Sequence, residues 1–331
     1  MKLRISDDER TEILKESVPP SRPSAWRSAR LSLAALILAP LAACSGTDPA
    51  PAAPPAQEPA SVQQADPVPQ TAAFEELERT FDARLGVYAV DTATGRNLAY
   101  HADDRFGYAS THKVFTAGAV LQRTPIEGLE RTVTYGANDL VPNSPITQRN
   151  LGTAPTASIT LRAAMDAALR YSDNTADNLL FREIGGPAGM AAALREAGDT
   201  TTHADRIEPA LNDLAPGEIR DTSTPRALAA SLRAFTLGEA LPEEKRTILT
   251  DMMRANVTGD SVIRAGTPAG WQVADKTGTA KYGTRNDIAV VWPPQRAPIV
   301  LVILSDRKAK DSDHDDKLIA QAAAAALGVF Q

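Results

Sequence analysis

Strand-like segments lie at both ends of the folding part of this chain, with helical patterns between them. Residues 84–91 and 97–102 flank the sequence TATGR, which is typical of a hairpin turn. Three further apolar runs follow late in the chain, at 271–278, 287–293 and 298–305. Strands from both termini can share one sheet when the helices between them form a separate layer. We therefore expect an α+β fold with an antiparallel sheet of about five strands and an inserted all-helical subdomain. Any functional site is expected in the cleft between the two parts.

Alanine- and leucine-rich stretches with helical periodicity fill the middle of the chain. They place the sheet part at about residues 73–107 and 256–331 and the helical part at about 108–255. The expected helices cover residues 73–81, 111–122, 161–172, 175–184, 187–197, 225–236, 242–255 and 316–327.

The N-terminus carries an export pattern. Three arginines, at positions 22, 27 and 30, precede LSLAALILAPLAAC, an apolar run too short to span a bilayer comfortably and typical of a secretion signal. The run ends in Leu41-Ala42-Ala43-Cys44, which resembles a bacterial lipobox, and Cys44 is the single cysteine of the chain. We expect a lipoprotein-type signal peptide at residues 1–43; the alternative is a plain signal peptide with a chance cysteine.

Residues 44–72 are rich in Pro, Ala and Gln, and they lack the large apolar side chains needed for a core. They are expected to be a disordered tether that leads to one folded domain at residues 73–331. The expected location is the cell envelope, on the periplasmic side or the outer face of a membrane. Lipid on Cys44 would hold the protein there, with a partly secreted form also compatible.

The composition excludes several classes of function. The formal net charge is −6, which gives no reason to expect nucleic acid binding. Four histidines and one cysteine, without paired ligand spacing, argue against a structural metal site.

The first motif with chemical content is Ser-Thr-His-Lys, an S-x-x-K at the start of an apolar helix. Residues three apart share a helix face, so Lys113 can reach the hydroxyl of Ser110. Desolvation and the helix dipole both favour the neutral amine, which can accept a proton from a serine. The alternative is that Ser110 is a helix N-cap and Lys113 extends to solvent. The same spacing recurs at Ser305 and Lys308, where a solvated charge run is the natural interpretation. His112 lies off the Ser–Lys face, which favours a packing role.

A second motif, Ser172-Asp173-Asn174, falls at a break between two expected helices. The hydroxyl of Ser172 and the carboxamide of Asn174 could face the cleft as a proton relay and a substrate ligand. The alternative is a capping cluster at a helix start, a role that suits Asp173 in particular.

A third motif, Lys276-Thr277-Gly278, lies near the end of an expected strand. Gly278 permits close approach of a ligand to an edge backbone. Lys276 and Thr277 offer a charge and a hydroxyl to an anion. The alternative is an edge strand protected by lysine.

The three motifs together, in this order, resemble the serine β-lactamases and penicillin-binding proteins, and the set is typical of the class A β-lactamases. The resemblance extends from about residue 73 to the C-terminus. Residues 204–225 are similar to the class A Ω-loop, whose Glu-Pro-x-Leu-Asn core is present at residues 208–212. Arg206 and Asp221 match the ion pair at the neck of that loop, and a cis peptide before Pro209 is also implied.

The resemblance implies an α/β/α sandwich and a serine acyl-enzyme mechanism. Ser110 would attack the lactam carbonyl, and either Lys113 or Glu208 acting through a water would accept its proton. Ser172 would pass a proton to the departing nitrogen, while Glu208 and Asn212 would activate the deacylating water. The implied mechanism needs neither a metal nor an organic cofactor.

Further residues are implied to bind substrate. The oxyanion would lie at the backbone N–H groups of Ser110 and Thr279, and Asn174 would contact the side-chain amide of the substrate. The substrate carboxylate would meet four side chains of two neighbouring strands: Lys276, Thr277, Thr279 and Arg285. A monomer acting on small β-lactams is expected. The alternatives are a D-alanyl-D-alanine peptidase of the penicillin-binding group and a non-catalytic, lipid-anchored binding protein.

Overall fold

The computed structural model describes residues 71–215 and 217–331. The expected signal peptide, Cys44 and the expected tether as far as residue 70 lie outside them. Within the described ranges, no helix has the length and apolar character that crossing a membrane requires.

The secondary structure follows the expected order of strands, helices and strands. The strands are β1 (Arg84–Asp91), β2 (Asn97–Tyr100), β3 (Phe106–Gly107), β4 (Thr132–Gly136), β5 (Thr156–Thr160), β6 (Thr222–Ser223), β7 (Gln272–Ala280), β8 (Thr284–Trp292) and β9 (Ile299–Asp306). The helices are α1 (Thr71–Phe81), α2 (Lys113–Arg123), α3 (Pro145–Leu151), α4 (Leu161–Arg170), α5 (Asn174–Ile184), α6 (Pro187–Glu196), α7 (Pro225–Thr236), α8 (Glu243–Arg254), α9 (Ile263–Gly266) and α10 (Asp316–Gly328). Short 3-10 turns include η1 (Ala109–His112) and η4 (Ala210–Asn212).

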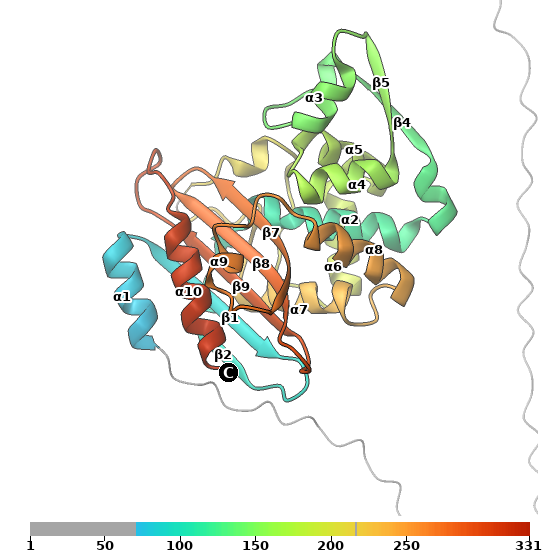
Figure 1. The fold of residues 1–331 in the computed structure, drawn as a ribbon. Coiled ribbons are helices and arrows are strands. Elements are labelled where there is room, and N and C mark those ends of the chain that lie inside the picture. Colours follow the sequence, from blue (N-terminus) through green and yellow to red (C-terminus); the bar gives the residue numbers. More distant parts are fainter. Residues whose placement is uncertain (1–70, 216) are drawn as a thin grey trace, which may run out of the picture. The chain divides into compact units, whose positions relative to one another are not determined.

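Five strands form one antiparallel sheet in the order β2-β1-β9-β8-β7, which confirms the predicted α+β fold. The two N-terminal strands join the three C-terminal ones through β1 and β9, with Arg84 opposite Asp306 and Asp91 opposite Ile299. Figure 1 shows these two strands side by side although they stand at opposite ends of the described chain. The buried apolar run of β9 explains its central place, because a middle strand is covered on both faces.

Helices cover both faces of the sheet. Side chains alternate along a strand, so Leu85, Val87 and Ala89 of β1 belong to one apolar cluster, with α10 and α1. Tyr88 and Val90 belong to a second cluster that includes α7 and most of the helical part. Figure 1 shows α1 and α10 along one side of the sheet, which gives the implied α/β/α arrangement.

The edge strand β7 joins the sheet to the helical part. It packs against η1 and against α8, so the last strand in the sheet order lies beside the start of α2. This arrangement brings the first and third sequence motifs together.

Some elements were not predicted. These are the helices α3 and α9, the antiparallel pair β4–β5, the pair β3–β6, and the ends of β7 and β8 around their shared turn. Only one residue in each of β4 and β5 is buried, so their sequences lack the apolar alternation by which a strand is detected.

Candidate active site

Ser110 lies in the 3-10 turn η1, one turn before α2 begins at Lys113. The alternative interpretation, in which Ser110 caps the helix, is wrong, because neither η1 nor α2 begins with a side-chain capping bond. Its hydroxyl instead accepts a hydrogen bond from Lys113 Nζ at 2.6 Å. The preceding residue, Ala109, has a φ of +47°, a left-handed conformation that is uncommon for a residue with a Cβ. The turn therefore presents Ser110 to its partners and is not a regular helix start.

Gly278 lets β7 lie directly against this turn. A Cβ at Gly278 would lie 2.9 Å from the carbonyl oxygen of Tyr108 and 3.2 Å from the amide nitrogen of Ser110. Sequence analysis predicted the close approach of a ligand; the observed neighbour is the serine segment itself. Asn286 of β8 supports this contact, since its Nδ2 donates to the carbonyl oxygens of Gly107 at 2.7 Å and Tyr108 at 3.2 Å.

Lys113 is fully buried and joins the motifs of three separate elements. Its Nζ donates to Ser110 Oγ at 2.6 Å, to Asn174 Oδ1 at 2.7 Å and to Glu208 Oε1 at 2.6 Å. Three acceptors match the three N–H bonds of an ammonium, and one of them is a carboxylate. The expectation of a neutral Lys113 amine did not include this carboxylate, because Glu208 comes from a distant loop.

Glu208 is held on its loop by two asparagines. Asn178 Oδ1 accepts from the Glu208 amide at 3.1 Å, and Asn178 Nδ2 donates to the Glu208 carbonyl at 2.8 Å. Asn212 Nδ2 donates to Glu208 Oε2 at 2.6 Å, while Asn212 Oδ1 is buried without a partner among the described residues. The peptide before Pro209 is cis, as implied. The carboxylate also lies 3.4 Å from Ser110 Oγ.

Two opposing effects set the charge of Glu208. Burial raises the pKa of this carboxyl, but the positive charge of Lys113, the neighbouring His112 and the hydrogen bonds from Lys113 and Asn212 outweigh it, so the net pKa is lowered. The side chain is therefore ionised at neutral pH, which is the form that can accept a proton.

The neck of the loop is closed by the expected ion pair. Arg206 Nε donates to Asp221 Oδ2, and Asp221 Oδ1 accepts from the amides of Asp205 and Arg206 at 2.9 and 3.0 Å. The hydroxyl of Tyr108 also donates to Asp221 Oδ1 at 3.0 Å. The loop that carries Glu208 is thus attached to the residue two positions before Ser110.

Ser172 and Lys276 meet across the gap between the helical part and β7. Lys276 Nζ donates to Ser172 Oγ at 3.1 Å and to the Thr277 carbonyl at 2.8 Å. Burial and the nearby charge of Lys113 lower the pKa of Lys276 to about 7, against the opposing effect of Asp275 and other carboxylates. Lys276 is therefore close to its charge transition at neutral pH.

Arg285 and Thr279 are paired across β7 and β8. They are opposite each other in the register, and an Arg285 NH group donates to Thr279 Oγ1 at 3.0 Å. Arg285 Nε donates to Asp316 Oδ1 at 2.6 Å, which fixes the guanidinium. Thr277, two residues before Thr279, points to the same face of the strand, so the three polar side chains lie together on one face of the β7 edge.

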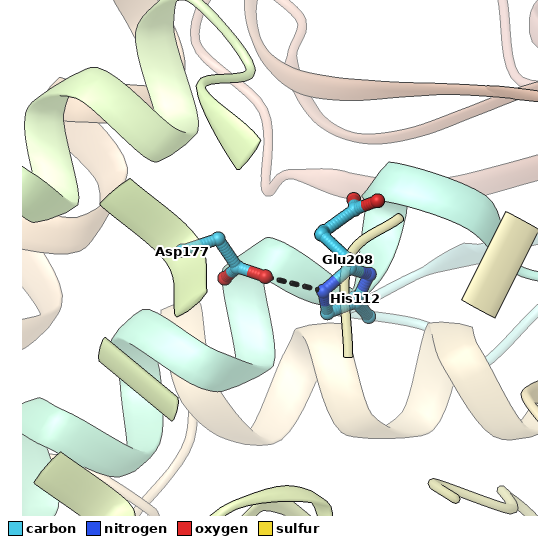
Figure 2. A group of neighbouring side chains, drawn as sticks. All are labelled: His112, Asp177 and Glu208. Atoms are coloured by element: carbon cyan, nitrogen blue, oxygen red, sulfur yellow. Dashed lines mark hydrogen bonds and ion pairs between the residues drawn. The ribbon is translucent and has the colours of Figure 1, made fainter. Parts of the chain in front are cut away.

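Sequence reasoning missed a buried pair beside Glu208. His112 Nε2 and Asp177 Oδ2 are 2.7 Å apart, and Figure 2 shows this bond next to the Glu208 side chain. One ligand atom from each of the three residues lies within 4.8 Å of the others, a spacing that could hold a metal ion. The His–Asp hydrogen bond already occupies Nε2 and Oδ2, however, and the Lys113 ammonium contacts Glu208, which opposes a second cation. His112 therefore does more than pack, because its ring is also hydrogen-bonded to a buried carboxylate. The only sign of this pair in the sequence is Asp177 itself, which lies three residues after Asn174 in another expected helix.

These contacts define a serine acyl-transfer enzyme that carries a carboxylate on a separate loop. The family model described as the beta-lactamase enzyme family matches residues 70–330, and the chain belongs to this family. It is 56% identical over 254 residues to the beta-lactamase of Bacillus amyloliquefaciens, covering 77% of this chain and 82% of that one. It is 45% identical over 301 residues to the beta-lactamase ROB-1 of Haemophilus influenzae, covering 89% of this chain and 96% of that one.

A solved structure places the chain in class A. The class A beta-lactamase from Clostridium kluyveri DSM 555 is 48% identical and superposes with a TM-score of 0.76, covering 78% of this chain and 98% of that one. The predicted class A serine β-lactamase is confirmed, and with it the hydrolysis of β-lactam antibiotics as the activity of the chain. These relatives give no support to the peptidase alternative.

Proposed function

We propose that this β-lactamase opens the lactam through an acyl-enzyme on Ser110 and clears it with Glu208. The observation that carries the proposal is the position of the Glu208 carboxylate, 3.4 Å from Ser110 Oγ and bonded to Asn212. A carboxylate in reach of both the nucleophile and a water position can act in both half-reactions.

Acylation begins with Ser110 Oγ attacking the lactam carbonyl carbon. In the resting arrangement the Lys113 amine already holds three acceptors as an ammonium, so Glu208 is the group with a free lone pair for the serine proton. The C–N bond of the lactam then breaks, and the nitrogen takes the hydroxyl proton of Ser172. The Lys276 ammonium, 3.1 Å away, returns a proton to that oxygen. Before deacylation, Glu208 releases the serine proton and the Lys276 amine takes one up, so both groups regain their resting charge.

Deacylation uses the second carboxylate oxygen of Glu208, Oε2, which is the one bonded to Asn212. A water held between Glu208 and the unpartnered Asn212 Oδ1 gives its proton to the carboxylate and attacks the ester carbonyl. The C–O bond to Ser110 breaks, and the serine oxygen recovers a proton from Glu208 by way of Lys113. Both half-reactions thus leave the enzyme unchanged.

Substrate is oriented by the edge of β7. The N–H groups of Ser110 and Thr279 bind the carbonyl oxygen as it becomes an oxyanion. Three side chains, Lys276, Thr277 and Arg285, bind the substrate carboxylate together with the Thr279 hydroxyl. The carboxamide of Asn174 uses one N–H on the Pro142 carbonyl at 2.9 Å, which leaves a second for the side-chain amide of the substrate.

Repeated turnover tests this mechanism against stable acylation. With a chromogenic cephalosporin in large excess, we expect product to form linearly for many turnovers per enzyme molecule. The reason is that Glu208 and Asn212 are placed to hydrolyse the ester. A single burst equal to the enzyme concentration, followed by no further product, would instead indicate a penicillin-binding protein.

The low pKa of Lys276 predicts a loss of activity on the alkaline side. Below pH 7 the ammonium is present before substrate binds; above it, binding an anionic substrate requires uptake of a proton. We expect kcat/KM for a penicillin to fall as pH rises above about 7, by up to roughly tenfold per pH unit. The Lys276→Arg variant keeps its charge over this range and should lack that limb of the profile. Identical alkaline limbs in the two proteins would assign the titration to another group.

We also propose a lipid anchor at Cys44, with a signal peptide at residues 1–43 and a tether that begins at residue 44. The expected end of the tether at residue 72 is two residues too late, because α1 begins at Thr71. The support is the lipobox-like Leu41–Cys44 sequence and the position of the only cysteine. A monomer is proposed because one chain supplies every residue of the mechanism.

A lipid anchor on Cys44 predicts in which fraction the protein is found when cells are separated into membrane and soluble parts. In a bacterium that processes lipoproteins, Cys44→Ala should move the full-length chain from the membrane pellet to the soluble fraction, with unchanged specific activity. An unaltered partition between the two fractions would rule out lipid on Cys44 as the anchor.

A further inference from the structure

The buried pair formed by His112 and Asp177 lies beside the segment that carries Ser110 and takes no part in the proposed reaction steps. His112 is 1% exposed and Asp177 is fully buried. The imidazole packs between the rings of Phe181, with centroids 5.6 Å apart, and Tyr108, at 5.5 Å. Figure 2 shows the pair directly beside the Glu208 side chain.

Both nitrogens of His112 face acceptors. Nε2 is 2.7 Å from Asp177 Oδ2, and Nδ1 is 2.7 Å from the carbonyl oxygen of Ala109. A carbonyl oxygen cannot donate, so Nδ1 carries a hydrogen and donates it to Ala109. The second proton lies between Nε2 and Oδ2, whichever atom holds it, which fixes the ring in this orientation. Asp177 is thus the group that orients His112.

The acceptor on Ala109 belongs to the same peptide unit as the Ser110 amide. A peptide is planar, so a hydrogen bond to its carbonyl oxygen also sets the direction of its N–H. A hydrogen bond to the carbonyl also polarises the peptide and makes its N–H a stronger donor. The orientation of this peptide is costly for the chain, because Ala109 has a φ of +47°.

Helix α5 carries Asp177, which orients the His112 donor to this peptide, and two other residues that contact the site. Its Asn174 accepts from Lys113, and its Asn178 brackets the backbone of Glu208. Asp177 lies between these two residues and acts on a third segment, through His112. One helix therefore sets the positions of the amine, the carboxylate and the serine peptide.

We propose that His112, oriented by Asp177, is a positioning residue that directs and polarises the 109–110 peptide, so that the Ser110 N–H binds the substrate oxyanion more strongly. The inference rests on the proposed use of that N–H in the oxyanion hole. In this proposal a chain of hydrogen bonds runs from Asp177 to His112 and from His112 to the Ala109 carbonyl. The N–H of the same peptide, on Ser110, then binds the substrate carbonyl.

The infrared stretch of the acyl carbonyl tests the proposal, because its frequency falls as hydrogen bonding to the carbonyl oxygen strengthens. The spectrum is taken on a penicillin with a ¹³C-labelled lactam carbonyl, with the acyl-enzyme trapped by Glu208→Gln in the full chain. His112→Phe keeps the aromatic packing and removes the donor, so we expect a higher carbonyl frequency. In the parent Glu208 background, acylation should become about tenfold slower.

Two variants separate positioning from packing. His112→Asn keeps an N–H donor near the position of Nδ1 and should restore most of the frequency. Asp177→Asn still bonds to Nε2 but holds the ring less strongly, so its shift should have the same sign and be smaller. The matched control is Asp104→Asn, in the exposed pair where His101 Nδ1 lies 3.1 Å from Asp104 Oδ2, and it should change neither readout.

The result that would overturn the inference is an unchanged carbonyl frequency in folded, acylated His112→Phe. If that variant does not fold, an unchanged frequency in Asp177→Asn overturns it equally. Failure of the proposed function would look different, because intact mass would then find no adduct on Ser110 in the trapped enzyme that carries native His112.

Discussion

Replacing Glu208 with glutamine should stop the enzyme at the acyl stage. The deacylating water would lose its only base among the described residues, and we expect the hydrolysis rate of the ester to fall about a thousandfold. Acylation should persist, because Lys113 Nζ, 2.6 Å from Ser110 Oγ, is the other group placed to accept the serine proton. Intact mass after brief exposure to benzylpenicillin should show nearly complete addition of one acyl group.

The same loop offers a matched control. Glu218 is a half-buried carboxylate whose partner is the exposed Arg220 within the loop, so Glu218→Gln removes a charge from the loop without touching the site. It should turn over penicillin at nearly the parental rate and show no adduct. Rapid clearance of the adduct from Glu208→Gln would remove Glu208 from the deacylating role.

Local sequence signals predicted most of the fold. The bounds of β1 and α7 match the sequence prediction, because each has a clear local signal. β1 is bordered by a turn sequence, and α7 has Pro225 in its first turn and Thr224 as a side-chain cap. The β4–β5 strand pair has one buried residue in each strand and no such signal, so only the tertiary structure reveals it.

The candidate site shows a similar division. The residues of the three motifs and of the Glu208 loop could be named from the sequence because each motif is contiguous. The contacts that position them are not contiguous: His112 meets Asp177 across 65 residues, and Asn178 meets Glu208 across 30. Pairing at such separations depends on how α2, α5 and the loop pack. For the same reason the sequence argument treated Lys113 as neutral, since it could not include the charge of Glu208.

The S-x-x-K spacing itself occurs twice, and the structure explains why only one copy is expected to react. Ser110 Oγ has Lys113 and Glu208 within hydrogen-bond distance. Ser305 lies buried on β9, its hydroxyl donates to the Arg285 carbonyl at 2.7 Å, and Lys308 is exposed beyond the strand. A serine whose hydroxyl is committed to a backbone carbonyl, without a base beside it, is not an activated nucleophile.

Exchanging each serine for alanine turns this difference into a measurement. Ser110→Ala should reduce kcat for a penicillin on the order of a millionfold and abolish the acyl adduct, because no other nucleophile is placed at the site. Ser305→Ala loses one buried hydrogen bond, worth about 1 kcal/mol of folding stability, and should keep nearly parental kcat. Thermal unfolding of both variants shows whether each is folded during the assay. Residual turnover by a folded Ser110→Ala close to that of Ser305→Ala would mean that the acyl group is carried by another residue.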